Sequence, residues 1–151
     1  MRYRISRPIA GREGARVIAL DGGARAIIER LSPQPWGGHS RYLSVAEHKG
    51  NAGGERDSVS LLDIDGAVSS LAEEFAEADV VVMVATTDAD AAAASIIGAV
   101  STSRAITTAG VVVGEGAAAS QTVAVLRPHA RVLVVSGHEE DISDLLTALR
   151  A

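Results

Sequence analysis

Residues 80–90 decide the fold, and they read Val-Val-Val-Met-Val-Ala followed by Thr-Thr-Asp-Ala-Asp. Six consecutive apolar residues at 80–85, most of them β-branched, are typical of a central parallel strand that is covered on both faces. The polar residues at 86–90 contain helix-capping side chains, and an alanine-rich segment continues from them to Val100. A strand, a short turn and a helix in this order indicate one repeating unit of an α/β sheet.

The same alternation of strand and helix extends in both directions along the chain. Toward the N-terminus the sequence predicts a strand at 15–20, an Asp-Gly-Gly turn, a helix at 24–31, strands at 41–45 and 58–64, and an amphipathic helix at 68–75. Toward the C-terminus it predicts a strand at 106–113, a helix at 117–126, a strand at 131–135 and a final helix striped by leucines to Leu149. Each connection is long enough for parallel pairing of the strands that it joins.

We therefore predict a single α/β domain over residues 15–151, with a three-layer, doubly wound, mostly parallel sheet of the Rossmann-like kind. Residues 1–14 are arginine-rich and weakly patterned, and we expect an N-terminal arm or an added edge strand. Residues 46–58 have no periodicity and predict a polar loop. Trp36 lies in a Pro/Gly loop, where it either anchors a partner, stacks on a ligand or covers the edge of the core.

Composition narrows the possible functions. The chain has 151 residues, which fits one domain, and it has no cysteine, which excludes disulfides, thiol catalysis and Cys-ligated zinc. A formal net charge of −5 argues against general nucleic-acid binding. No apolar run reaches the about 18–20 residues that a membrane-spanning helix needs. We expect a soluble, cytoplasmic protein whose partners are neither nucleic acids nor membranes.

The order of segments resembles the nucleotide-binding domain of the FtsZ/tubulin family of cytoskeletal GTPases. The resemblance covers most of residues 15–135 and rests on Val17-Ile18-Ala19-Leu20-Asp21-Gly22-Gly23, on residues 78–85 (Ala-Asp-Val-Val-Val-Met-Val-Ala), on residues 108–113 (Thr-Ala-Gly-Val-Val-Val) and on residues 125–135. It implies a Rossmann-like scaffold. It also raises the alternative that nucleotide binds at the Gly22-Gly23 turn and the helix N-terminus that follows.

The chain departs from this family in the phosphate loop. The family's loop is a run of glycines with a threonine, whose bare backbone amides surround the phosphates. The matching residues 85–90 contain no glycine and two carboxylates, Asp88 and Asp90. Repulsion between close like charges costs about 1–4 kcal/mol in partly screened surroundings. We therefore predict the scaffold without GTPase activity.

A receiver-type signalling domain is a further comparison. Residues 61–65 resemble a strand that carries a phosphoacceptor aspartate, and Val84-Ala85-Thr86 resembles the strand with the switch threonine. A receiver also needs paired acids after its first strand and a lysine after its fifth. The chain has Asp21-Gly22 and Gly114-Glu115 at those places, which leaves magnesium binding and phosphoryl stabilisation incomplete.

Candidate site residues lie at the predicted carboxyl ends of the strands, where ligands bind in open α/β sheets. The ligand-binding candidates are Asp21, Gly22, Gly23, Thr86, Thr87, Asp88, Gly114 and Glu115. The metal-binding candidates are Asp88, Asp90 and His138, because carboxylates suit magnesium, calcium or manganese. The same residue types also fit two helix-capping boxes, Thr87 with Asp90 and Ser136 with Glu139. Gly114-Glu115-Gly116 matches part of a dinucleotide fingerprint, with Ala119 in place of its third glycine.

These patterns favour a binding or protein-interaction module that takes a small molecule or a protein partner and forms a homo-oligomer. Residues 1–57 carry ten basic and six acidic groups, whereas residues 58–151 carry four and thirteen. Such a division either drives contact between copies or marks two differently charged solvated faces. The alternatives are a divalent-metal-dependent enzyme that uses the carboxylates above, and a nucleotide-binding protein. No catalytic residue is assigned, and a divalent cation is the one cofactor that the pattern suggests.

Overall fold

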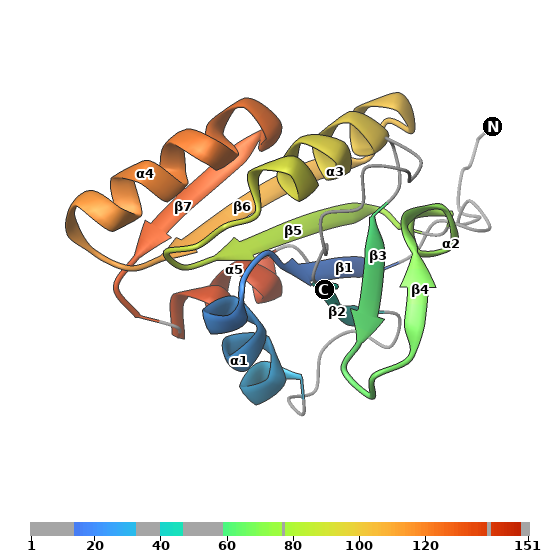
Figure 1. The fold of residues 1–151 in the computed structure, drawn as a ribbon, viewed down its shortest axis with the longest axis horizontal. Coiled ribbons are helices and arrows are strands. Elements are labelled where there is room, and N and C mark those ends of the chain that lie inside the picture. The colour runs from blue at the N-terminus through green and yellow to red at the C-terminus, as the bar shows by residue number, and fades with distance from the viewer. Residues whose placement is uncertain (1–13, 33–39, 47–58, 77, 139, 149–151) are drawn as a thin grey trace, which may run out of the picture.

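The computed structural model describes residues 14–32, 40–46, 59–76, 78–138 and 140–148 (Figure 1). The predicted N-terminal arm, the loop with Trp36 and the polar loop at 46–58 lie almost entirely outside these residues. The strands are β1 (Ala15–Ala19), β2 (Arg41–Val45), β3 (Ser60–Asp63), β4 (Val68–Ser70), β5 (Val80–Ala85), β6 (Thr107–Val113) and β7 (Val132–Ser136). The helices are α1 (Gly22–Leu31), α2 (Leu71–Phe75), α3 (Ala91–Ser103), α4 (Gly116–Leu126) and α5 (Glu140–Ala148), with a 3-10 turn, η1 (Arg127–His129), after α4.

The described strands form one seven-stranded sheet in the order β4-β3-β2-β1-β5-β6-β7. Pairs from β2 through β1, β5 and β6 to β7 are parallel, whereas β3 pairs antiparallel with both β2 and β4. From β1 the chain moves outward to β2, and it later moves from β5 in the opposite direction. The carboxyl ends of β1 and β5 are therefore neighbours at the point where the strand order reverses. The predicted α/β class with a mostly parallel sheet is confirmed.

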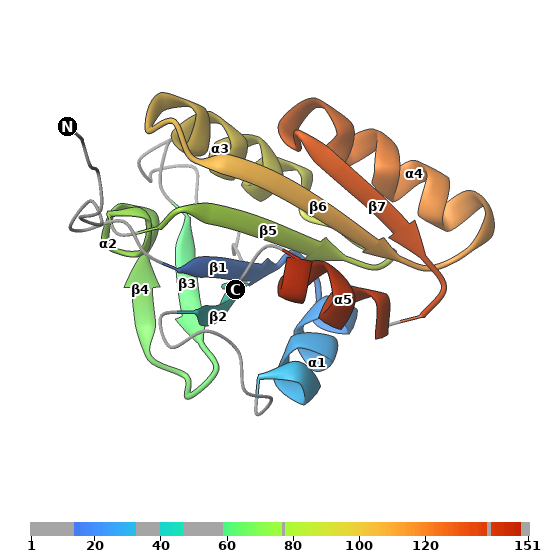
Figure 2. The ribbon, with the colours of Figure 1, turned by 180° about the vertical axis from the view of Figure 1, so that it is seen from behind.

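Two buried apolar clusters flank the sheet. One combines residues of β5 and β6 with residues of α2, α3 and α4, among them Phe75, Ile97 and Leu126. The other combines alternate residues of β1 and β5 with α1 and α5, including Ile28 and Ile142. Figure 1 shows α3 and α4 in front of the sheet, and Figure 2, seen from behind, brings α5 forward, with α1 next to it. Every residue of β1 and β5 is buried, as the apolar run at 80–85 predicts.

The predicted amphipathic helix at 68–75 is wrong in its first turn. Val68–Ser70 forms the strand β4, and the helix begins only at Leu71. Gly66, with φ of 90°, allows the tight turn that folds β4 back on β3. Ser70 then starts the helix by accepting a hydrogen bond from the Glu73 amide. The sheet is mostly parallel, and the antiparallel pairs are those that β3 makes with β2 and with β4.

Helix starts also differ from the prediction. The first helix begins at Gly22 rather than at Ala24, because Asp21 caps it. The predicted Thr87–Asp90 capping box is wrong, since Asp90 is itself the cap of α3 and accepts a 3.0 Å hydrogen bond from the Ala93 amide. Glu139, half of the second predicted box, lies outside the described residues.

An ionic cluster at the amino ends of β1 and β2 was not predicted. Glu74 of α2 is buried, and its carboxylate accepts hydrogen bonds from Arg41 Nε at 2.7 Å and from Ser69 Oγ at 2.6 Å. Arg16 Nε lies 3.4 Å from the same carboxylate, and Arg41 also contacts Asp63 at 3.2 Å. The hydrogen bond to Glu74 raises the pKa of Arg41 above its usual value. The cluster joins α2 and the β3–β4 hairpin to the parallel strands.

Candidate functional site

The residues at the carboxyl ends of β1 and β5 form one hydrogen-bonded cluster centred on Asp21. Asp21 Oδ1 accepts hydrogen bonds from the Ala24 amide and from Thr86 Oγ1, and Oδ2 accepts one from the Thr86 amide, each at 2.7 Å. The first of these bonds caps α1, and the other two tie the loop after β5 to the loop after β1. Four predicted site residues, Asp21, Gly22, Gly23 and Thr86, are thus brought together.

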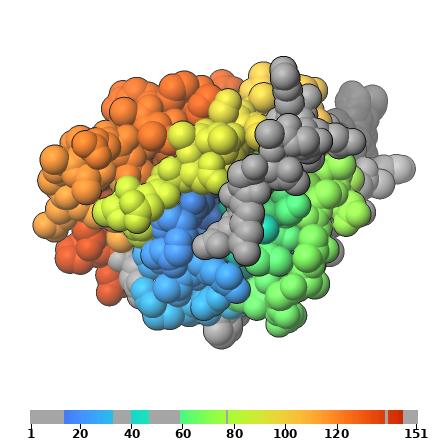
Figure 3. All heavy atoms as spheres, in the orientation of Figure 1, coloured from blue at the N-terminus to red at the C-terminus, as the bar shows by residue number. Residues whose placement is uncertain are grey.

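The space beside this carboxylate is filled by Thr86. A Cβ atom at Gly23 would lie 2.5 Å from Thr86 Oγ1, whereas one at Gly22 would meet nothing within 4 Å. Figure 3 shows the yellow-green segment that follows β5 lying directly against the blue atoms of the α1 region. Two further hydrogen bonds hold the loop, from the Asp90 amide to the Leu20 carbonyl and from Thr122 Oγ1 to the Thr86 carbonyl.

This arrangement uses the features that would otherwise bind an anion. The first turn of a helix attracts negative charge because its amides and its dipole point toward the ligand. Here a carboxylate of the chain occupies that position and takes the amide of Ala24. A phosphate placed at the start of α1 would meet the charge of Asp21 and the side chain of Thr86.

The remaining predicted site residues of the loop after β5 differ in their exposure and in their role. Thr87 and Asp88 are exposed, and Asp90 is engaged as the cap of α3. His138, also exposed, follows β7 and lies on another loop. Within the described part of the chain, no three His, Asp or Glu side chains gather where they could hold a metal ion.

Gly114 and Glu115 lie at a second place, between the ends of β6 and β7. The Gly114 amide donates to the Ser136 carbonyl at 2.9 Å, and Gly116, with φ of 73°, starts α4 in a conformation that favours glycine. Glu115 precedes α4 but its side chain makes no capping hydrogen bond. A Cβ atom at Gly137 would lie 2.7 Å from Glu115 Oε1, so the carboxylate rests against the end of β7.

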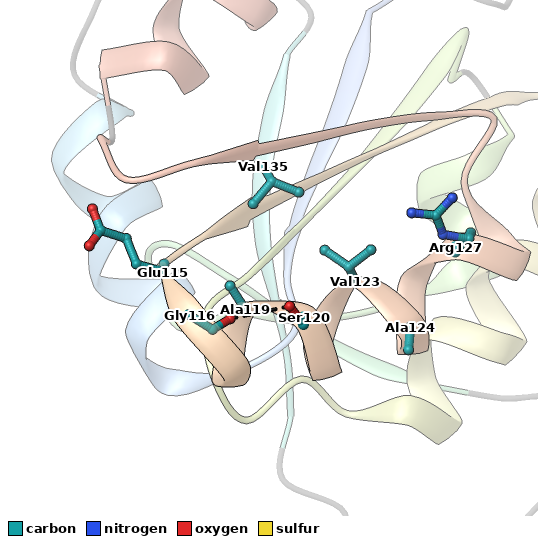
Figure 4. A pocket seen from close by; sticks show the side chains of 9 residues that line it. Glu115, Gly116, Ala119, Ser120, Val123, Ala124, Arg127 and Val135 are labelled. Atoms are coloured by element: carbon teal, nitrogen blue, oxygen red, sulfur yellow. Dashed lines mark hydrogen bonds between the residues drawn. The ribbon is translucent and has the colours of Figure 1, made fainter.

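An open groove of about 460 Å³ runs from this point between α4 and β7. Its lining is mostly apolar or small and consists of Gly114, Glu115, Gly116, Ala119, Ser120, Val123, Ala124, Arg127 and Val135. Figure 4 shows Glu115 and Arg127 at opposite ends, with Val123 and Val135 between them. Of these residues only Gly114 and Glu115 were predicted site residues. For Val135 a signal exists in the sequence, because residues 132–135 are all apolar, and Gly116 and Ala119 belong to the partial dinucleotide fingerprint described above.

Comparisons of the chain with protein-family models, with curated proteins and with solved structures gave no significant match. Among the described residues, no helix combines the length and the apolar character that crossing a membrane requires.

Proposed function

We propose that this chain is a protein-interaction module without GTPase activity, built on a three-layer, doubly wound Rossmann-like scaffold similar to the nucleotide-binding domain of the FtsZ/tubulin family. The reversal of strand order between β1 and β5 supports the doubly wound topology. So do the two apolar clusters, which take helices from both faces of the sheet.

The Asp21 cluster is the observation that carries the proposal. In folds of this kind the ligand crevice lies where the strand order reverses. In this chain three donors at that point are directed at Asp21, and Thr86 fills the space over Gly23. A nucleotide would have to displace these hydrogen bonds and approach a negative charge. The α4–β7 groove, by contrast, leaves apolar side chains open to a partner.

Nucleotide titration tests the proposal. Thermal unfolding and isothermal titration would be measured with GTP, GDP, ATP and NAD, each with and without magnesium, and we expect neither a shift nor heat of binding. Asp21→Asn is the matched variant, because it keeps the shape of the side chain and removes its charge. Nucleotide binding by the wild-type chain would overturn the proposal. An increase in melting temperature on addition of magnesium or manganese that disappears in an Asp88→Asn, Asp90→Asn double variant would instead favour the metal-dependent enzyme.

A further inference from the structure

The strand β7 lies at the edge of the sheet, and its outer side is suited to pairing with a further strand. It pairs with β6 on one side, and no other described strand pairs with it. Val132 is 48% exposed and Val135 is 51% exposed, and their odd spacing places them on opposite faces of the sheet. Residues 132–135 carry no charge, proline or glycine. An edge of this kind is a template for a strand of another chain unless something protects it.

Opposite charges mark the two ends of this edge. Arg131 is exposed immediately before β7, and Glu115 rests against Gly137 immediately after it. Neither side chain takes part in an ion pair within the described part of the chain. The alternation of side chains along a strand puts position 131 on the same face as Leu133 and Val135, the face covered by α4.

This pattern is complementary to itself. An antiparallel pair of β7 strands with a two-fold axis at Val134 sets Val135 opposite Leu133 of the second copy. The same register sets Arg131 opposite the second copy's Gly137, beside its Glu115, and the symmetry makes this contact twice. A shift of register by one residue would turn the apolar side chains to the wrong face. A shift by two residues would separate the charges.

We propose that two copies of this chain associate through antiparallel β7 strands in this register, so that one sheet runs through the dimer. The second copy covers Val132 and Val135 and closes the outer side of the α4–β7 groove. The inference rests on the proposed function, since it names the partner of the interaction module as a second copy of the chain.

Variants at the two sheet edges test the strand assignment. Light scattering after size-exclusion chromatography and sedimentation equilibrium over a wide range of concentrations should show a dimer for the wild-type chain. Val135→Lys should raise the dimer dissociation constant about tenfold or more, because a charge would enter the paired edge. Val68→Lys, at the exposed β4 edge, is the matched control and should leave the constant unchanged. Circular dichroism would verify that both variants are folded.

Charge reversal tests the register. Arg131→Glu and Glu115→Arg should each weaken the dimer about tenfold, because each creates two like-charge contacts across the axis. The variant that carries both Arg131→Glu and Glu115→Arg should restore the wild-type dimer affinity. Added salt should weaken the wild-type dimer, because it screens the contacts between the charges. A wild-type monomer, a dimer broken by Val68→Lys but not by Val135→Lys, or a double variant without recovery would each overturn the inference. A monomer that binds no nucleotide would leave the proposed function standing with a different partner, whereas nucleotide binding would overturn the function itself.

Discussion

The two ends of the parallel strands each contain a carboxylate that joins segments distant in the sequence, but they do so with different partners. At the carboxyl end, Asp21 accepts hydrogen bonds from the neutral donors of Ala24 and Thr86. At the amino end, Glu74 is buried between two arginines, Arg16 and Arg41. In both cases the carboxylate binds groups of the protein itself.

The difference between these ends concerns what each could still bind. The Glu74 cluster neutralises its own charge, and its burial makes it part of the framework. The Asp21 cluster is partly exposed and satisfies the helix N-terminus with an internal anion. The end of the sheet where a ligand is usually bound is therefore closed by hydrogen bonds, and the open apolar surface lies instead at the β7 edge.

Removal of the Glu74 carboxylate should have the largest effect. Glu74→Ala removes the carboxylate that pairs with the buried Arg16 and with Arg41. Breaking a buried ion pair costs about 3–5 kcal/mol. We expect this loss in the free energy of unfolding, measured by urea denaturation. Glu73→Ala, at the exposed neighbouring position, is the control and should change stability by less than about 0.5 kcal/mol. Equal losses from both variants would show that α2, rather than the ionic cluster, accounts for the effect.

Asp21→Ala sharpens the comparison at the other end. The variant loses the cap of α1 and two hydrogen bonds to Thr86, which together should cost about 2–3 kcal/mol in unfolding free energy. Asp88→Ala removes an exposed acid from the neighbouring loop and should be close to neutral. If Asp21→Ala proves neutral and acquires affinity for phosphate, the internal anion is an inhibitor of binding and not a structural link.

A pair of glycine variants tests how closely the loop after β5 contacts α1. Gly23→Ala should destabilise the chain by about 1–2 kcal/mol, because the new methyl group displaces the Thr86 hydroxyl from Asp21. Gly22→Ala has open space and should be neutral or stabilising by about 0.4–1 kcal/mol. Thermal unfolding of both variants would measure the difference, and identical melting temperatures would contradict the contact.

Tyr42 provides the smallest effect and contrasts with both carboxylates. Its hydroxyl is buried without a hydrogen-bond partner among the described residues, and burial raises its pKa. The folded state therefore favours the protonated phenol, so its contribution to stability is complete below about pH 10 and declines above it. Tyr42→Phe should change stability by less than about 1 kcal/mol at neutral pH and reduce the alkaline loss. If the unfolding free energy of the wild-type protein and of Tyr42→Phe depended on pH in the same way, the alkaline loss would not come from Tyr42.

The fold was predictable where one local pattern decides the outcome. The apolar run at 80–85 identifies the central strand, and the stripe of apolar residues at 24–31 identifies the first helix, although that helix begins two residues earlier, at Gly22. The helix prediction at 68–75 failed because helical spacing in so short a segment also fits a hairpin strand followed by one helical turn. The capping prediction at Thr87 failed because Asp90 has the same capping ability three residues later.

The sequence by itself determined the α/β alternation, the mostly parallel sheet and the set of acids and glycines at the strand ends, because these follow from periodicity and local propensity. Only the tertiary structure decided what these acids contact. It directs Asp21 toward Thr86, 65 residues away, and buries Glu74 against Arg16, 58 residues away. It also leaves β7 at the edge of the sheet. Such pairings depend on the order of the strands in the sheet. The hydrophobic pattern of a single strand does not specify which other strand will lie beside it.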